Sequence, residues 1–219
     1  MPIQLGKKIL ANSDLKNGKK MSLNKDITNT QEFIKNYFDY NYSIIQSLDY
    51  AAIEKFVDLI LDSRRKRQSI FFIGNGGSAS TATHFVNDIT LGSRQFDDPF
   101  RCISLCDNQA CITAIGNDDG YENIFLQQLQ TLFKEGDILV AISASGNSQN
   151  LLTAADWIKT KDGFMVGLTS FDGGALKDKS DLNIHVPAVK GEYGPAEDIH
   201  MMICGLVGTL LRIKFGVLS

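Results

Sequence analysis

The spacing of apolar residues changes character near residue 70. Before it, apolar side chains recur every three or four positions, which is typical of helices with one buried face. We expect two helices there, the first capped by Thr30 and the second by Asp49. After it, short and nearly continuous apolar runs alternate with helical stretches, a pattern typical of parallel strands buried on both faces. These runs are 70–73, 102–105, 138–142, 164–168 and 182–186.

This pattern predicts an α/β fold, a three-layer α/β/α sandwich with a five-stranded parallel sheet, preceded by N-terminal helices. Residues 1–27 have weak periodicity, and we interpret them as a loosely ordered leader before a single domain over 28–219. A final helix is predicted from Pro195 to about Phe215. It is apolar around much of its circumference, so we expect it to be buried, and an interface between subunits is one way to bury it.

Composition narrows the class of protein. A net charge of -3 gives no general basic field, which disfavours nucleic acid as the main ligand. No segment approaches the roughly 20 apolar residues of a membrane span, and none resembles a signal peptide. Four cysteines lack any C-x-x-C pairing, as expected of reduced thiols in a cytoplasmic protein. They are Cys102, Cys106, Cys111 and Cys204.

Two loops after predicted strands carry the chemistry of an anion site. The first is Gly74-Asn75-Gly76-Gly77-Ser78, and the second is Ser143-Ala144-Ser145-Gly146-Asn147-Ser148. Each leads into a predicted helix, whose free backbone amides bind anions, and serine hydroxyls add donors. Neither loop has the glycine spacing of a dinucleotide site or the lysine of a nucleoside triphosphate site. In parallel sheets, ligands bind beyond the carboxyl ends of strands, so we expect both loops to hold a phosphate.

Further motifs extend this pattern to a family. They are His84 behind the first loop, Ala114-Ile115-Gly116-Asn117-Asp118, Ile142 to Ser148, and Leu168-Thr169 before Asp172-Gly173-Gly174. In this order, over about Phe33 to Leu211, they resemble sugar isomerase (SIS) domains, specifically the phosphoheptose isomerase branch. The resemblance implies a flavodoxin-like fold, a homotetramer with sites shared between subunits, and a substrate such as sedoheptulose 7-phosphate. It also implies that the serines lie near the phosphate, and Asn75 and Asp118 near the sugar hydroxyls. The expected substrate-binding residues are Asn75, Gly76, Gly77, Ser78, Asp118, Ser143, Ala144, Ser145, Ser148 and Glu197.

Aldose–ketose interconversion moves a proton between neighbouring carbons, so it needs a base, an acid and a group that polarises the carbonyl. His84 and Asp88 stand four residues apart, which places them on one helix face. The isomerases present a histidine here and, four residues on, a glutamate that acts as base and metal ligand. Asp88 is one methylene shorter.

The last helix departs from the family. The isomerases carry a glutamine there and the catalytic histidine eight residues later; the corresponding residues here are Glu197 and Gly205. Glycine cannot transfer a proton, which leaves Asp88, Glu197 and His200 as candidate catalytic residues. A rearranged zinc site of His84, Asp88, Glu197 and His200 is the matching hypothesis for a metal.

Three functions remain open at this point. The leading one is a phosphosugar isomerase, an intramolecular oxidoreductase that would turn over a ketose phosphate. The missing histidine also fits a sensor that binds a sugar phosphate without turnover. It fits equally a protein-binding tetramer similar to the bacterial replication-initiator-associating protein, which would capture its partner with no sugar present.

Overall fold

The computed structural model describes residues 22–23 and 29–218, so the expected leader falls almost entirely outside the described residues. Its centre is a parallel sheet of five strands in the order β2-β1-β3-β4-β5, as the apolar runs predicted. The strands are β1 (Ser69–Gly74), β2 (Arg101–Ser104), β3 (Ile138–Ser143), β4 (Phe164–Ser170) and β5 (Leu182–Val186). The middle strand β3 is buried along its whole length, which is why it contains only apolar residues before its terminal serine.

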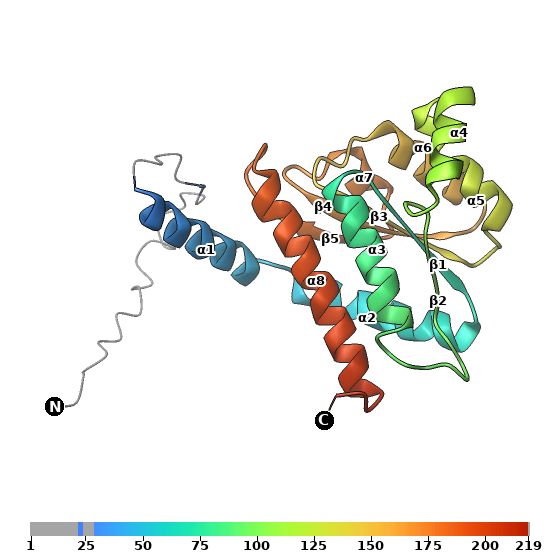
Figure 1. The fold of residues 1–219 in the computed structure, drawn as a ribbon, viewed down its shortest axis with the longest axis horizontal. Coiled ribbons are helices and arrows are strands. Elements are labelled where there is room, and N and C mark those ends of the chain that lie inside the picture. Colours follow the sequence, from blue (N-terminus) through green and yellow to red (C-terminus); the bar gives the residue numbers. More distant parts are fainter. Residues whose placement is uncertain (1–21, 24–28, 219) are drawn as a thin grey trace.

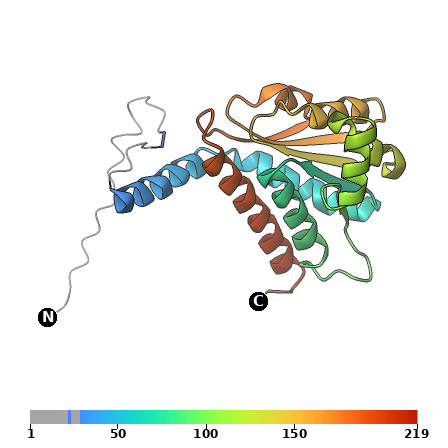
Figure 2. The same cartoon turned by 45° about the horizontal axis from the view of Figure 1, so that its top comes forward.

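Helices cover both faces of the sheet. They are α1 (Thr30–Gln46), α2 (Tyr50–Lys66), α3 (Gly77–Thr90), α4 (Gln109–Asp118), α5 (Leu126–Leu132), α6 (Gln149–Lys159), α7 (Gly174–Lys179) and α8 (Tyr193–Lys214), with a short 3-10 turn, η2 (Tyr121–Asn123). One face packs against α2, α3 and α8 and the other against α5, α6 and α7, which gives the expected three layers (Figures 1 and 2).

Aromatic packing anchors α3 to the sheet. The ring of Phe85 on α3 stacks on Phe72 of β1 at 5.3 Å between centroids and meets Phe56 of α2 edge-on at 5.9 Å. All three rings are fully buried, so each contributes its whole apolar surface to the core on this face. The orientation of α3 is therefore fixed by contacts beneath it.

The strand order creates a crevice. After β1 the chain moves to one side for β2 and then crosses to the other side of β1 for β3. The helix that follows β1, α3, therefore lies on one face, and the helix that follows β3, α6, lies on the opposite face. Such a switch point, at the carboxyl ends of two adjacent strands, is where ligands bind in sheets of this kind.

The caps of the first two helices differ in how well they were predicted. Asp49 caps α2 as expected, because its carboxylate accepts hydrogen bonds from the backbone N–H groups of Ala51 and Ala52. The cap of α1 is Asn29 and not Thr30, since the Asn29 side chain accepts a hydrogen bond from the Glu32 N–H at 3.2 Å. Thr30 is the first residue of the helix.

Two helices leave apolar side chains uncovered. The first turns of α1 project away from the sheet (Figure 1), and Phe38 on this helix is 66% exposed. Helix α8 is buried on one face, whereas Met202, Leu206 and Ile213 on its other face are exposed. The predicted burial of the final helix is therefore confirmed for one of its faces, and burial of the other face between subunits stays a prediction.

No helix in the described ranges is both long and apolar enough to span a bilayer. All four cysteines fall within these ranges and are free thiols there.

A buried polar group lies between α8 and β4. His200 is fully buried, and its Nε2 lies 3.3 Å from the carbonyl oxygen of Thr169. The Nδ1 atom of His200 has no hydrogen-bond partner within the described residues. Burial lowers the pKa of His200 to about 4, so the imidazole is neutral at physiological pH.

This pKa makes stability depend on pH. The unfolded chain binds a proton on His200 near pH 6.5 but the folded chain only near pH 4, so the stability of the wild type should fall as pH drops from 6.5 towards 4. At about 1.4 kcal/mol per pKa unit, the loss from this residue is about 3 kcal/mol. We expect His200→Gln to flatten the profile over this range in urea unfolding at a series of pH values. Parallel profiles for the two proteins would contradict the assignment.

Candidate functional site

The loops after β1 and β3 lie side by side at the switch point. Gly74 at the end of β1 pairs with Ile142 of β3, so both loops leave the same edge of the sheet. A reciprocal amide pair joins them: Asn75 Nδ2 donates to Asn150 Oδ1, and Asn150 Nδ2 donates to Asn75 Oδ1, both at 2.9 Å. The hydroxyl of Tyr121 donates to the same Asn75 oxygen at 3.0 Å. The two predicted loops thus form one structural unit.

A hollow of about 430 Å³ opens at this junction. It combines Asn75 and Ser148, two predicted substrate-binding residues, with residues that sequence reasoning did not select. These are Tyr121, Glu122, Gln149 and Asn150. The position of Asn150 just inside α6, directly behind the serine-rich loop, was the available indication that it belongs to the site.

Each loop presents the start of a helix. Gly76 caps α3 at a φ of +56°, a conformation that glycine adopts without strain, and Ser148 caps α6. In the described chain neither residue makes a side-chain capping hydrogen bond, so the Ser148 hydroxyl is not engaged by its own helix. Helix starts are where anions bind, although at α3 the N–H groups of Ser78 and Ala79 already donate to the carbonyl oxygens of Asn75 and Gly76.

The remaining serines differ in their surroundings. Ser143 Oγ accepts a hydrogen bond from the Gly146 N–H at 3.0 Å, so this buried residue shapes the loop. Ser145 is half-buried, and its hydroxyl lies 3.5 Å from that of Ser143. Ser78, in the first turn of α3, is buried. Ala144, in the second loop, is buried as well. Ser145 and Ser148 are thus the more accessible hydroxyls.

Close backbone contact joins the second loop to the loop after β4. A Cβ atom on Gly146, whose φ is +64°, would lie 1.9 Å from the Gly173 carbonyl oxygen. On the other side, a Cβ atom on Gly174 would lie 2.4 Å from the Ser145 carbonyl oxygen. Only glycine fits at either position. The Asp172-Gly173-Gly174 turn, which contributes no predicted binding residue, therefore supports the phosphate loop from behind.

Asp118 stands apart from these loops. It is the exposed last residue of α4, and its carboxylate accepts a hydrogen bond from Asn117 at 2.7 Å. It does not line the hollow beside Asn75. Its expected contact with sugar hydroxyls stays a prediction.

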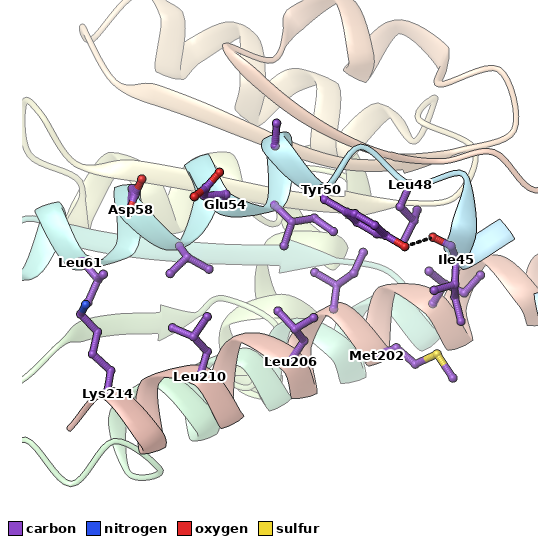
Figure 3. A pocket seen from close by; sticks show the side chains of 15 residues that line it. Ile45, Leu48, Tyr50, Glu54, Asp58, Leu61, Met202, Leu206, Leu210 and Lys214 are labelled. Carbon is purple, nitrogen blue, oxygen red and sulfur yellow. Dashed lines mark hydrogen bonds between the residues drawn. The ribbon is translucent and has the colours of Figure 1, made fainter. Parts of the chain in front are cut away.

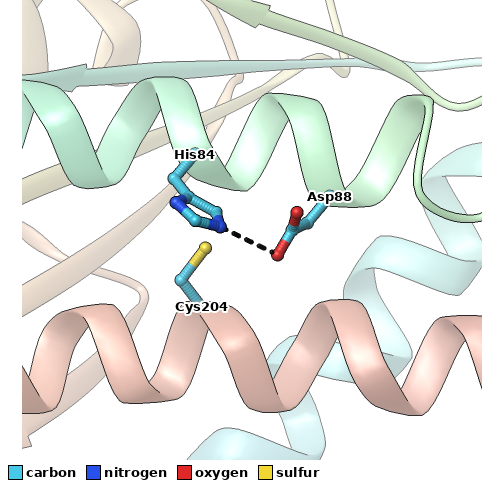
Figure 4. Close-up of side chains that lie close together, drawn as sticks. All are labelled: His84, Asp88 and Cys204. Carbon is cyan, nitrogen blue, oxygen red and sulfur yellow. Dashed lines mark ion pairs between the residues drawn. The ribbon is translucent and has the colours of Figure 1, made fainter.

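A second cluster lies further along α3. His84 Nε2 is 3.3 Å from Asp88 Oδ2, so the predicted pair forms on one face of this helix. The thiol of Cys204 on α8 joins them, and one donor atom from each residue lies within 4.8 Å of the others (Figure 4). His84 is half exposed, Asp88 is 25% exposed and Cys204 is buried. Sequence reasoning did not select Cys204 for the site.

Parallel packing of α3 against α8 brings this cluster together. Gly77 contacts Glu197 at the start of the two helices, since a Cβ atom on Gly77 would lie 2.3 Å from Glu197 Oε2. At the level of Asp88, a Cβ atom on Gly208 would lie 2.8 Å from Asp88 Oδ2. The small Gly208 gives the Asp88 side chain its space, and Cys204 lies between these two levels, opposite His84.

The expected zinc ligand set of His84, Asp88, Glu197 and His200 does not assemble in the described chain. Glu197 lies against the glycine loop, and His200 points into the core towards Thr169. His200 and Cys204 are one turn apart on the same side of α8, but the His200 ring ends at the Thr169 carbonyl of β4, whereas the Cys204 thiol reaches the His84–Asp88 pair of α3. The chemical types present in the cluster, one imidazole, one carboxylate and one thiol, are all ligands of zinc. The residues therefore fit a metal with Cys204 in place of Glu197 and His200.

The protonation state of the Cys204 thiol limits the chemistry that this residue performs without a metal ion. Burial, together with the neighbouring charge of Asp88, raises the pKa of this thiol to about 12. Without a cation the thiol is therefore protonated at neutral pH and is neither a base nor a nucleophile.

Gly205 does not face the cluster. A Cβ atom built on it meets nothing within 4 Å in the described chain. It lines an open groove on the outer side of α8 with Leu206, Thr209 and Leu210. A histidine at this position of the same chain would enter that groove.

Comparison with known proteins agrees with this architecture. The family model "SIS domain" matches residues 36–170. A phosphoheptose isomerase of Helicobacter hepaticus is 33% identical over 165 residues, which cover 75% of this chain and 83% of the relative. One from Cytophaga hutchinsonii is 38% identical over 152 residues, covering 69% and 78%. The structure of a phosphoheptose isomerase from Francisella tularensis aligns with a TM-score of 0.73 and 26% identity over 84% of this chain and 98% of that one. The chain thus belongs to the SIS-domain family, in its phosphoheptose isomerase branch.

Proposed function

We propose that this protein is a phosphosugar isomerase that interconverts an aldose and a ketose phosphate, with sedoheptulose 7-phosphate as the substrate to test first. The observation that carries the proposal is that the starts of α3 and α6 meet at the switch point, while His84 and Asp88 lie further along α3. The names of the similar proteins support a heptose phosphate as the substrate.

The substrate phosphate binds at the starts of α3 and α6. There it receives hydrogen bonds from backbone amides and from the hydroxyls of Ser145 and Ser148. No lysine or arginine lines the hollow at this junction among the described residues, so the anion is held by dipoles and neutral donors. Such a cradle binds a phosphate while still permitting product release.

The distance between the two halves of the site favours a long-chain sugar. At 1.5 Å per residue, His84 lies about 10 Å along α3 from Gly77. A substrate with its phosphate at the helix start and its reacting carbons beside His84 must span this distance. An open-chain sugar phosphate of seven carbons suits it better than a triose phosphate does.

The reaction needs one group that removes a proton from carbon and returns it to the neighbouring carbon. Asp88 is our candidate for this base, because its carboxylate is half-buried and oriented by His84. His84 assists by orienting this carboxylate. Glu197, against the glycine loop, is the second candidate base. A zinc ion held by His84 and Asp88 would polarise the carbonyl.

The first prediction of this proposal is turnover of a sugar phosphate. We expect the purified protein with added zinc to convert sedoheptulose 7-phosphate to its aldose isomer in a coupled or chromatographic assay. Asp88→Asn should lower kcat by about 10²- to 10⁴-fold, the usual contribution of a general base. Asp178→Asn is the matched control, since this exposed carboxylate on α7 lies on the opposite face of the sheet.

Other results would distinguish between the alternative functions. Binding of the sugar phosphate by calorimetry without any turnover would contradict the isomerase and favour a sensor. Neither binding nor turnover would favour the protein-binding role.

The second prediction concerns the phosphate. Ser145→Ala combined with Ser148→Ala should weaken sugar-phosphate binding by about 1 to 3 kcal/mol, because hydrogen bonds to a charged ligand are lost. Calorimetry measures this, with Ser47→Ala at the end of α1 as the control. Equal affinities for the double variant and the control would remove these serines from the phosphate site.

We also propose that copies of the chain assemble, as a homotetramer with shared sites. The support is an apolar groove of about 660 Å³ between α2 and α8 (Figure 3). Its lining includes Ile53, Val57, Met202, Leu206 and Leu210. An apolar groove with exposed apolar side chains such as Met202 and Leu206 along it is typical of protein interfaces. Phe38 and its neighbours on the projecting helix α1 add further apolar surface to bury.

The third prediction tests this assembly. Leu206→Glu places a charge in the groove and should reduce the molar mass measured by light scattering, because burying an unpaired charge is strongly unfavourable. Leu132→Glu is the matched control, since Leu132 on α5 is exposed to a similar extent, 46% against 49%. A monomeric wild type, or an unchanged mass for Leu206→Glu, would contradict an interface at this groove.

A further inference from the structure

We propose that Cys204 is the third protein ligand of a metal ion held by His84 and Asp88, so that the site is a thiolate site. The inference deepens the proposed function and rests on it, because carbonyl polarisation gives such an ion its use. It assigns to Cys204 the place for which sequence reasoning had Glu197 and His200.

The first support is geometry. An imidazole nitrogen, a carboxylate oxygen and a thiol sulfur, from two different helices, lie within 4.8 Å of one another. The three side chains point toward one another between α3 and α8 (Figure 4). Three protein ligands are what catalytic zinc sites use, with the fourth position open to water or substrate. The half-exposed His84 provides that access, since it also lines a surface hollow of about 610 Å³.

The second support is the register of the two helices. Of the residues on α8, Glu197 lies at the level of Gly77 and Gly208 at the level of Asp88, which leaves Cys204 opposite His84. Gly205, the position at which the family resemblance places the catalytic histidine, has open space around it within the described chain. Within one chain, Cys204 is thus the α8 side chain that reaches the pair.

Another sulfur lies near His84 and must be weighed. Cys106 lines the same surface hollow as His84. Its thiol, however, donates a hydrogen bond to the Gly74 carbonyl oxygen at 3.4 Å, and it is absent from the group that includes Asp88. Cys106 is therefore not the ligand, and it serves as the matched control.

A thiolate changes which metals the site prefers. Sulfur ligands favour Zn²⁺ and Co²⁺, whereas carboxylate and water ligands suit Mg²⁺ and Mn²⁺. When the ion binds, the sulfur–metal bond forms and the thiol proton leaves to solvent. A site of His84 and Asp88 alone would lack this preference.

The test is a Co²⁺ titration of the purified full-length protein, without substrate, followed by absorption spectroscopy. The wild type should bind Co²⁺ with a near-ultraviolet sulfur-to-cobalt charge-transfer band. Cys204→Ser should abolish the band and weaken Co²⁺ binding by about tenfold or more, since loss of even an outer-shell partner has that effect. Cys106→Ser should keep both the band and the affinity.

Two results would overturn the inference: a wild type that binds Co²⁺ without the band, or a Cys204→Ser variant that keeps it. If Cys204→Ser does not fold, as judged by circular dichroism, a variant with Cys102, Cys106 and Cys111 all replaced by Ser decides instead. Retention of the band then assigns the sulfur to Cys204, and its loss contradicts the proposal. Because no substrate is present, the band also separates the two proposals. A band without turnover contradicts only the isomerase, and turnover without a band contradicts only the thiolate ligand.

Discussion

The parallel packing of α3 against α8 is the contact on which the chemistry of this protein depends. The two helices keep one register over three successive levels, Gly77 with Glu197, His84 with Cys204 and Asp88 with Gly208. At two of these levels a glycine allows a carboxylate side chain from the other helix to lie between the axes. A larger residue at Gly208 would press on the Cβ atom of Asp88 and displace its carboxylate from His84. The close packing of α3 against α8 is therefore also what holds the side chains of the cluster together.

The phosphate half of the site depends on a different constraint, the order of the strands. Because β1 and β3 are neighbours whose helices lie on opposite faces, their two loops meet at the crevice without competing for space. The Asn75–Asn150 amide pair then joins them. The helix α3 belongs to both halves, since its first turn faces the crevice and its later turns face α8. A rigid helix, anchored by Phe85, thus fixes the distance between the phosphate and the reacting groups.

Much of this architecture was predictable from local sequence. Strands buried on both faces must be apolar, so their positions and the sheet class followed from short apolar runs, and the glycine- and serine-rich loops followed from where those runs end. The outer face of α8 was harder, because apolar residues around a helix do not reveal which of them one chain buries. Asn29 was missed as a cap because Thr30, the next residue, is of a type that also caps helices.

Cys204 and His200 show where sequence reasoning stops. Both lie on α8, one turn apart, yet one faces α3 and the other faces Thr169. Judged by residue type alone, the histidine was the expected metal ligand and the cysteine an ordinary buried core residue. The difference depends on how α8 packs against α3, more than a hundred residues earlier, and against Thr169 of β4. No local pattern carries that information.

The interlocked glycines behind the phosphate loop have a consequence for how this protein varies. Gly146 and Gly174 each leave no room for a methyl group, so the loop after β4 is constrained as tightly as the loop it supports. A survey of tolerated substitutions would find the Gly173–Gly174 turn nearly as restricted as the serines in front of it, although it offers no side chain to a ligand. Intolerance to mutation here would identify residues that support a binding loop as well as residues that contact the ligand.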